Sequence, residues 1–285
     1  MKSVWVYVTA GLMSGAFLTS CGSGDAPSTD PRYYSPGGYW TGSLNGEPGV
    51  GLVDESGNFT FIAADGEQYP ATLVISDILD PSAQPLTPYG ASFSGTMQSL
   101  QPSKFPNYGG PTQCPPPNYF PPNSVGLGSV DLGSGILSGT IVPRQSISGS
   151  ATFKPPACTV TEGISLTFNA LYYVPSSLAT ISGMYKDSAT GTVFTVSADG
   201  TVFAQDATTG CVINGTVSII NPSYNVYGIE VSYASCTGSL IPLNGLTLAG
   251  LAALDNTKSP EQVLAGVWSS IQPNILSVTY MLVRL

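Results

Sequence analysis

The chain has 285 residues, of which 42% are hydrophobic and only 9% are charged, so a large core can form beneath a surface that carries few charges. It contains no His, and its 8 Lys and Arg stand against 17 acidic residues, for a formal net charge of −9. These numbers exclude mechanisms that need imidazole and argue against nucleic-acid binding, which requires a basic surface. The 33 Gly and 24 Pro indicate a chain rich in turns and poor in helix.

The N-terminus has the pattern of a bacterial export signal. Lys2 precedes an apolar run from Val4 to Leu18, which is shorter than the roughly 20 residues that span a bilayer. The run leads into Leu18-Thr19-Ser20-Cys21-Gly22, which resembles the lipobox of bacterial lipoproteins. The resemblance implies a signal peptide over residues 1–20, acyl chains such as palmitate on Cys21, and anchoring in the outer membrane, because Gly22 is not the Asp of inner-membrane retention. The alternative is an ordinary secretory signal with a chance Cys.

Composition divides the rest of the chain into a tether and two β domains. Residues 21–37 are rich in Ser, Gly, Pro and Asp and are expected to form a flexible tether. The first domain is expected over residues 38–175 and the second over residues 176–285. The first contains an insertion at residues 101–123, where frequent Pro indicates an extended loop.

A repeat links the two halves. Each opens with an aromatic residue near a Gly, at Tyr39-Trp40-Thr41-Gly42 and at Ile181-Ser182-Gly183-Met184-Tyr185, and then runs through an apolar strand into an Asp-containing turn. Further along, Leu137-Ser138-Gly139-Thr140-Ile141 is similar to Ile213-Asn214-Gly215-Thr216-Val217. The repeat favours two domains of related structure.

Alternation of apolar and polar residues predicts strands throughout both halves. Between two of them, Asp199-Gly200 predicts a type I′ hairpin turn. One short helix is expected from Ser259 to Val267, where Ser259, Pro260 and Gln262 match a capping box. The expected strands are Asn58–Ile62, Ser92–Gln98, Ile136–Val142, Ile147–Phe153, Ile164–Tyr172, Thr192–Ser197, Thr201–Ala204, Cys211–Ile220, Val226–Ser232, Gly245–Leu254 and Ser277–Arg284.

The fold class is therefore all-β, with two small antiparallel barrels or sandwiches. We favour up-and-down barrels, because closure removes sheet edges that so few charges could protect. Gly38-Tyr39-Trp40 resembles the Gly-x-Trp opening of lipocalin-like barrels, and Arg284 is a candidate to cover a barrel base; the resemblance spans three residues and no ligand follows from it. A single transmembrane outer-membrane barrel is an alternative, against which stand the lipobox, the Pro-rich insertion and the C-terminal Leu285.

Four cysteines remain after Cys21. An even number in an exported chain indicates disulfides, with three ways to pair them. We favour Cys114–Cys158 and Cys211–Cys236, because each pair then lies within one expected domain. Free buried thiols are the alternative, and the absence of Cys-x-x-Cys argues against a redox or zinc motif.

Catalytic motifs are missing from the sequence. Without His there is no Ser-His-Asp triad and no His-Glu-x-x-His zinc site, and no nucleotide-binding Gly motif precedes a helix, so neither an enzyme nor a cofactor is expected. A pair of carboxylates acting as in glycosidases is an alternative, with Glu162, Glu230 and Asp255 as candidates. The alternation in Tyr227–Val231 predicts that Glu230 faces solvent.

Three Asp-containing segments offer oxygen atoms that calcium prefers, at residues 54–57, 187–191 and 206–210. None matches the EF-hand pattern. Asp and Gly are also the ordinary residues of hairpin turns, so we expect turns and no metal site.

Aromatic residues supply the remaining candidates for binding, since Tyr is rigid, amphipathic and enriched at interfaces. Four lie in the Pro-rich insertion and are the candidate partner contacts: Phe105, Tyr108, Tyr119 and Phe120. Four others lie where the tether meets the first domain: Tyr33, Tyr34, Tyr39 and Trp40.

Together these features predict an outer-membrane lipoprotein that serves as a non-catalytic binding or structural module of the cell envelope. Its expected partners are the membrane, through the lipid anchor, and a protein, glycan or small apolar ligand, but no nucleic acid. Two alternatives stand beside this hypothesis: a lipocalin-like carrier of small molecules, and a carboxylate-dependent glycan hydrolase.

Overall fold

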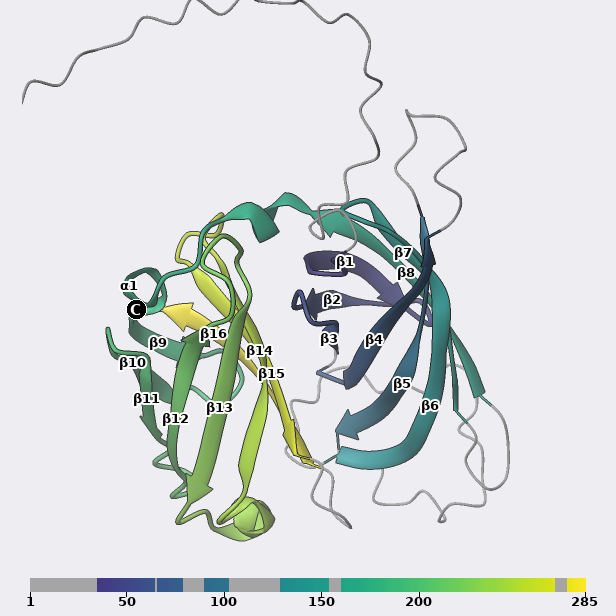
Figure 1. Ribbon diagram of the computed structural model, residues 1–285. Helices are drawn as coiled ribbons and strands as arrows, with labels where there is room; N and C mark the ends of the chain where they lie inside the picture. Colours follow the sequence, from purple (N-terminus) through teal and green to yellow (C-terminus); the bar gives the residue numbers. More distant parts are fainter. Residues whose placement is uncertain (1–34, 65, 79–89, 103–128, 154–159, 270–275) are drawn as a thin grey trace, which may run out of the picture.

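The computed structural model describes residues 35–64, 66–78, 90–102, 129–153, 160–269 and 276–285. Within them the chain forms two closed antiparallel barrels of eight strands each (Figure 1). In each barrel every strand pairs with the next along the chain, and the last strand pairs with the first. The expected β domains are confirmed as up-and-down barrels, and the chain does not form one large barrel.

The first barrel closes where β1 pairs with β8, with Gly42 opposite Leu166. Its interior is filled by large side chains, among them Trp40, Phe61 and Met97, as is usual for a barrel of eight strands. Its strands are β1 (Gly38–Leu44), β2 (Glu47–Val53), β3 (Asn58–Ala63), β4 (Gln68–Ile78), β5 (Ala91–Pro102), β6 (Ser129–Val142), β7 (Ser146–Phe153) and β8 (Val160–Asn169).

A short connection joins the barrels. It contains the 3₁₀ helix η2 (Ala170–Tyr173) and the one-turn helix α1 (Leu178–Ile181). The strand expected to reach Tyr172 ends at Asn169, because the Asn169 side chain accepts a hydrogen bond from the Leu171 backbone N–H at 2.9 Å and starts η2. The expected domain boundary, at residues 175 and 176, lies within this connection.

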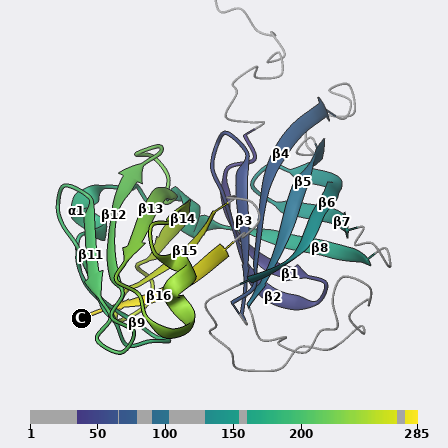
Figure 2. The same ribbon diagram turned by 90° about the horizontal axis from the view of Figure 1, so that it is seen from below.

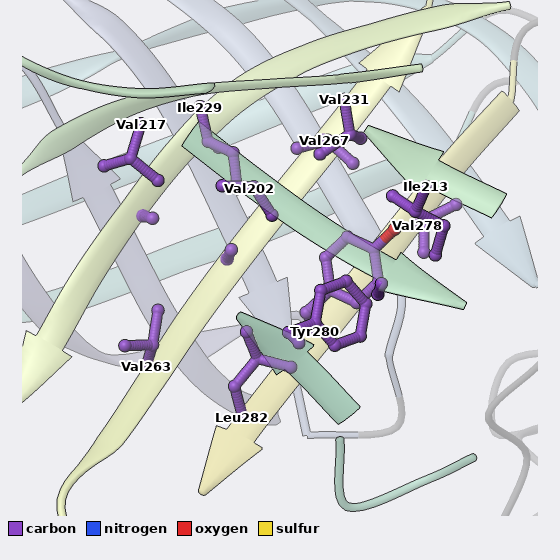
Figure 3. Close-up of a cluster of buried hydrophobic side chains, with 14 of the residues drawn as sticks. Val202, Ile213, Val217, Ile229, Val231, Val263, Val267, Val278, Tyr280 and Leu282 are labelled. Carbon is purple, nitrogen blue, oxygen red and sulfur yellow. The ribbon is translucent and has the colours of Figure 1, made fainter. Parts of the chain in front are cut away.

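The second barrel closes where β16 pairs with β9, with Val283 opposite Lys186. Apolar side chains from its strands, including Val202, Ile229 and Tyr280, point into a shared interior (Figure 3). Its elements are β9 (Gly183–Asp187), β10 (Val193–Val196), β11 (Thr201–Gln205), β12 (Val212–Ile219), β13 (Tyr227–Ala234), the 3₁₀ helix η3 (Gly238–Leu243), β14 (Thr247–Asp255), β15 (Gln262–Ser269) and β16 (Leu276–Arg284). No helix in the described part of the chain is long and apolar enough to cross a membrane.

The expected helix from Ser259 to Val267 is wrong, because Gln262–Ser269 form strand β15. Val263, Ala265 and Val267 face the barrel interior, while the opposite face of the strand packs against the first barrel. Because the outer face is also partly buried, the sequence lacks the apolar–polar alternation that reveals a half-buried strand.

The type I′ prediction at Asp199-Gly200 is also wrong, since Gly200 (φ 88°) has a positive φ and Asp199 does not. The loop closes with hydrogen bonds from Gly200 N to Ser197 O at 2.9 Å and from Ser197 N to Thr201 O at 2.8 Å, a three-residue hairpin loop ending in a left-handed Gly. The β2–β3 loop has the same form, with Gly57 at φ 88°. The sequence repeat thus matches equivalent hairpins here, whereas the similar segments in β6 and β12 occupy different positions in their barrels.

The barrels stand side by side and pack along their outer faces (Figure 2). A cluster of buried apolar residues, here called the interbarrel cluster, joins β1–β3 and η2 to β14 and the segment before β13. Its buried members are Tyr39, Leu52, Ile62, Leu171, Tyr172, Val226, Leu251 and Ala253. Burial raises the pKa of Tyr39 to about 12, with Asp255 adding to the shift.

Polar contacts surround the interbarrel cluster. Gln68 Nε2 donates to Thr279 Oγ1 at 2.8 Å, and Asn221 Nδ2 donates to Glu55 Oε2 at 2.5 Å. At another edge the Arg144 guanidinium donates to the Tyr224 hydroxyl at 3.0 Å. The two barrels are therefore held by both apolar burial and directional hydrogen bonds.

Candidate functional site

The two ends of the second barrel differ, and one of them is closed. At this end Arg284 donates to the carbonyl oxygens of Thr180 at 2.6 Å and Ser182 at 3.0 Å, next to α1. Its guanidinium lies 5.0 Å from the centre of the Tyr185 ring, and its Nε lies 2.7 Å from Glu261 Oε2. Arg284 therefore covers one end of the second barrel.

The opposite end holds a cavity of about 60 Å³, here called the mouth cavity. Two carboxylates, Asp187 and Asp206, and two phenols, Tyr233 and Tyr280, line it together with Leu240 of η3. A smaller and wholly apolar cavity of about 20 Å³ lies deeper in the barrel. The mouth cavity is thus a mainly apolar opening that carries two carboxylates, above an apolar, nearly filled interior.

Both carboxylates sit in hairpin turns of the same sequence, Asp-x-x-Thr-Gly, between β9 and β10 and between β11 and β12. Asp187 Oδ2 accepts hydrogen bonds from Thr190 N at 2.9 Å and Thr190 Oγ1 at 2.7 Å. In the second turn Asp206 Oδ1 accepts from Thr208 N at 2.8 Å, and Asp206 Oδ2 accepts from Thr209 Oγ1 at 2.7 Å. Alternate hairpins of an up-and-down barrel meet at one end, which brings these two carboxylates to one cavity.

The electrostatics of the mouth cavity are dominated by negative charge. Burial raises the pKa of Asp206, but hydrogen bonds from Thr209 and Thr208 outweigh it and hold that pKa below its usual value. Asp187 is only 3% exposed, and its Oδ1 has no hydrogen-bond partner. No Lys or Arg is among the described residues that line the cavity.

The two phenol hydroxyls at the cavity, those of Tyr233 and Tyr280, form a hydrogen bond with each other. Burial raises the pKa of the Tyr233 hydroxyl, and the Asp187 carboxylate raises it further. Burial likewise raises the pKa of Tyr280 well above its usual value, with Tyr233 and Asp187 contributing. Both hydroxyls therefore stay protonated at neutral pH.

A disulfide fixes one side of the opening. The expected Cys211–Cys236 bridge is confirmed. Cys211 lines the mouth cavity, and Cys236 precedes η3, whose Leu240 also lines it. Next to the bridge, Thr237 N and Thr237 Oγ1 donate to Thr209 O at 2.9 and 2.7 Å.

The first barrel contributes to the same site. Gly66, in the connection between β3 and β4, lines the mouth cavity. Its carbonyl oxygen accepts a hydrogen bond from Thr279 Oγ1 at 3.2 Å, and Thr279 in turn accepts from Gln68. The cavity is therefore built from both barrels.

The candidate acid–base carboxylates are not brought together. Glu162 is buried inside the first barrel, where burial raises its pKa to about 7. Glu230 is exposed on β13, as the alternation predicts. Asp255 ends β14 and accepts hydrogen bonds from the backbone and hydroxyl of Thr257.

The three Asp-containing segments are all turns. The Asp54 carboxylate accepts hydrogen bonds from Ser56 N at 2.8 Å and Asn58 N at 2.9 Å, both in its own turn. The carboxylates of Asp187 and Asp206 likewise accept hydrogen bonds from their own turns. Within the described residues no group of three or more His, Cys, Asp or Glu is placed to hold a metal ion.

Other expected site residues lie outside the described part of the chain. They are the lipidation residue Cys21, the expected Cys114–Cys158 bridge, the tether residues Tyr33 and Tyr34, and the candidate partner contacts Phe105, Tyr108, Tyr119 and Phe120. The remaining two aromatic residues at the tether exit are buried, Tyr39 in the interbarrel cluster and Trp40 in the core of the first barrel. The side chains of Tyr39 and Trp40 therefore contribute to packing.

Sequence reasoning missed the mouth cavity, although a signal was present. The Asp-x-x-Thr-Gly sequence occurs twice, and alternation places Asp187 on the same face as Tyr185 and Asp206 on the same face as Ala204, which point inward. An inward Asp in the turns of two neighbouring hairpins indicates that polar groups line the barrel mouth.

Comparisons of this chain with protein-family models, with curated proteins and with solved structures found no match.

Proposed function

We propose that this chain is a bacterial lipoprotein, anchored in the outer membrane through Cys21, that works as a non-catalytic binding module. The open end of the second barrel is its binding surface, and the first barrel supports that surface. The observation that carries the proposal is the mouth cavity, which both barrels line and to which Asp187 contributes a carboxylate whose buried Oδ1 lacks a hydrogen-bond partner. Buried polar atoms are almost always paired, so an unpaired one at an opening favours a bound ligand.

The two alternative functions fit the site less well. Carriers of small molecules enclose several hundred Å³, whereas the mouth cavity measures about 60 Å³. A glycan hydrolase needs two carboxylates on either side of a sugar ring. The cavity has room for only on the order of four water molecules, which is too little for a ring to enter.

Lipid anchoring is tested by expressing the full chain in a Gram-negative bacterium with radiolabelled palmitate. We expect label on the wild-type chain and its recovery in the outer-membrane fraction. The Cys21→Ala variant removes the thiol that receives the lipid and is expected to lose both. The control Ser20→Gly keeps a small residue before the Cys and is expected to retain both.

An unlabelled wild-type chain, or equal labelling of Cys21→Ala, would refute the anchor. Protease added to intact cells then separates two places for the binding surface. Digestion without lysis means that the barrels face the outside and bind external molecules. Digestion only after the outer membrane is opened means that they face the periplasm.

A further inference from the structure

The mouth cavity has the composition of a site for a small cation. Two carboxylates line it, and the described lining residues include no Lys or Arg. One carboxylate oxygen, Asp187 Oδ1, is buried without a hydrogen-bond donor. Burying an unpaired charged oxygen costs free energy, and a positively charged donor offsets that cost.

The donor arrangement suits an organic ammonium better than a metal ion. Of the four oxygens of Asp187 and Asp206, three already accept hydrogen bonds from their own turns. Calcium takes six to eight oxygen ligands, and no described group of three acidic, His or Cys side chains surrounds the cavity. An ammonium group carries three N–H donors and needs only one free carboxylate oxygen, with hydroxyls such as Thr192 and Ser277 nearby.

The rest of the lining suits a short alkyl chain. Phe194 and Tyr280 both line the cavity, with ring centres 5.1 Å apart in an edge-to-face pair, and aromatic faces attract ammonium ions. Ile213 and Val278 supply apolar walls. The volume fits an ammonium head with its first methylenes, while the open mouth lets the rest of the molecule extend outward.

We propose that the mouth cavity binds the primary ammonium head of an alkyl chain, with Asp187 Oδ1 as the charged acceptor. The proposal rests on the binding role proposed above and names its ligand chemistry. Such a head group is presented by a free alkyl amine or by a lysine side chain of a partner protein.

The test titrates the full mature chain, purified in detergent micelles, with n-butylammonium chloride while the methyl groups of Thr are followed by NMR. We expect saturable shifts of Thr190, Thr192 and Thr209, which line the cavity. Thr201 and Thr216 are exposed elsewhere on the barrel and are expected to stay unshifted. Sodium chloride at matched ionic strength and 1-butanol are expected to give no saturable shift at any of the five.

Asp187→Asn is the decisive variant. The amide oxygen can still accept from Thr190, while an NH₂ donor replaces the unpaired Oδ1, so binding is expected to weaken at least about tenfold. Asp199→Asn is the matched control, because Asp199 Oδ1 caps its own hairpin loop by accepting from Thr201 N, and Asp199 does not line the cavity. Leu240→Trp fills the cavity while leaving both carboxylates in the sequence and is expected to weaken binding to a similar extent.

The absence of saturable shifts in the wild-type chain up to about 100 mM amine, or unchanged binding by Asp187→Asn, would overturn the proposal. Putrescine and Nα-acetyl-lysine amide are titrated in parallel, and tighter binding of one identifies a free amine or a protein side chain as the source. Loss of palmitate from Cys21→Ala concerns only the anchor, so failure of the ammonium site and failure of the lipoprotein assignment are separate results.

Discussion

Single residues in this protein show two ways to bury a polar group. Asn225 is 1% exposed and fully paired: its Nδ2 donates to Leu254 O at 2.6 Å, and its Oδ1 accepts from Leu254 N at 3.1 Å. Glu162 is 5% exposed inside the first barrel, and its Oε2 has no hydrogen-bond partner. Asn225 therefore stabilises the junction of β14 with the segment before β13, whereas ionised Glu162 opposes folding.

Stability should depend on the protonation of Glu162. Burial raises its pKa from 4.5 to about 7, so in this interval the folded state holds a proton that the unfolded state has released. The free energy of unfolding is thus expected to fall as pH rises from 4.5 to 7. Glu162→Gln removes this loss and is expected to be more stable than the wild type at pH 8, by up to about 3 kcal/mol.

Urea unfolding at pH 5 and pH 8 measures the effect of Glu162. The control is Glu230→Gln, which alters an exposed carboxylate and is expected to leave the pH dependence unchanged. If Glu162→Gln unfolds with the wild-type pH dependence, Glu162 is ionised in the folded protein at neutral pH.

At the scale of elements, the mouth of the second barrel depends on turns that are stabilised by hydrogen bonds between their own residues. The β11–β12 turn is capped by Asp206 and tied to the β13–β14 connection by Thr237 and by the Cys211–Cys236 disulfide. These contacts hold η3 beside the strand ends that form the cavity. The shape of the opening is therefore fixed by contacts between neighbouring turns.

Removing this disulfide should weaken the second barrel. The bridge closes a loop with a sequence separation of 25, which corresponds to roughly 3 kcal/mol of stabilisation in the chain-entropy description. The double variant Cys211→Ser, Cys236→Ser is expected to lose about that much, measured by urea unfolding under non-reducing conditions. The wild type treated with reductant is the comparison, and a loss below about 1 kcal/mol in the double variant would contradict the expectation.

At the scale of the molecule, the barrels form one packed unit. The interbarrel cluster buries apolar side chains on faces that would be exposed in isolated barrels. Arg144 strengthens one edge, since its guanidinium lies 5.1 Å from the Tyr173 ring and 5.7 Å from the Tyr224 ring. Because Gly66 of the first barrel lines the mouth cavity, this packing also completes the candidate site.

Leu251→Asp should uncouple the barrels. Leu251 is 5% exposed within the interbarrel cluster, and a charge there removes apolar contact worth about 3 kcal/mol and must be desolvated. Calorimetry is expected to show one transition for the wild type and two for the variant, with a larger radius of gyration in X-ray scattering. Ile136→Asp, at a side chain 61% exposed on the first barrel, is expected to keep the wild-type behaviour. A single transition and an unchanged radius for Leu251→Asp would show that the cluster does not couple the barrels.

Much of the fold could be predicted because most strands have one apolar and one polar face. In β10 and β11, buried Phe194 and Val202 alternate with exposed Thr195 and Phe203, and even the exposed Phe203 keeps the period of two. The prediction failed at β15, where the barrel interior covers one face and the first barrel covers the other. The turn predicted at Asp199-Gly200 is present but is not of type I′, since residue identity alone does not fix the φ of Asp199.

The candidate site was less predictable than the fold. Its residues come from β9, β10, β12, β13, β16 and η3, from the β9–β10 and β11–β12 turns, and from a turn of the other barrel, so no local pattern contains them. The Asp residues were recognised as turn residues, which they are. Only the closed barrel shows that two of these turns meet over a shared opening and that Asp187 Oδ1 is left without a donor.

The sequence by itself determined the all-β class and the division into two similar halves, because periodicity and repeats are local properties, and this division favoured the Cys211–Cys236 pair among three possible pairings. The tertiary structure decided which strands close each barrel, which faces meet between the barrels and where a cavity lined by two carboxylates remains. These depend on contacts between residues far apart in the chain, such as Gly66 with Thr279, which no local pattern records.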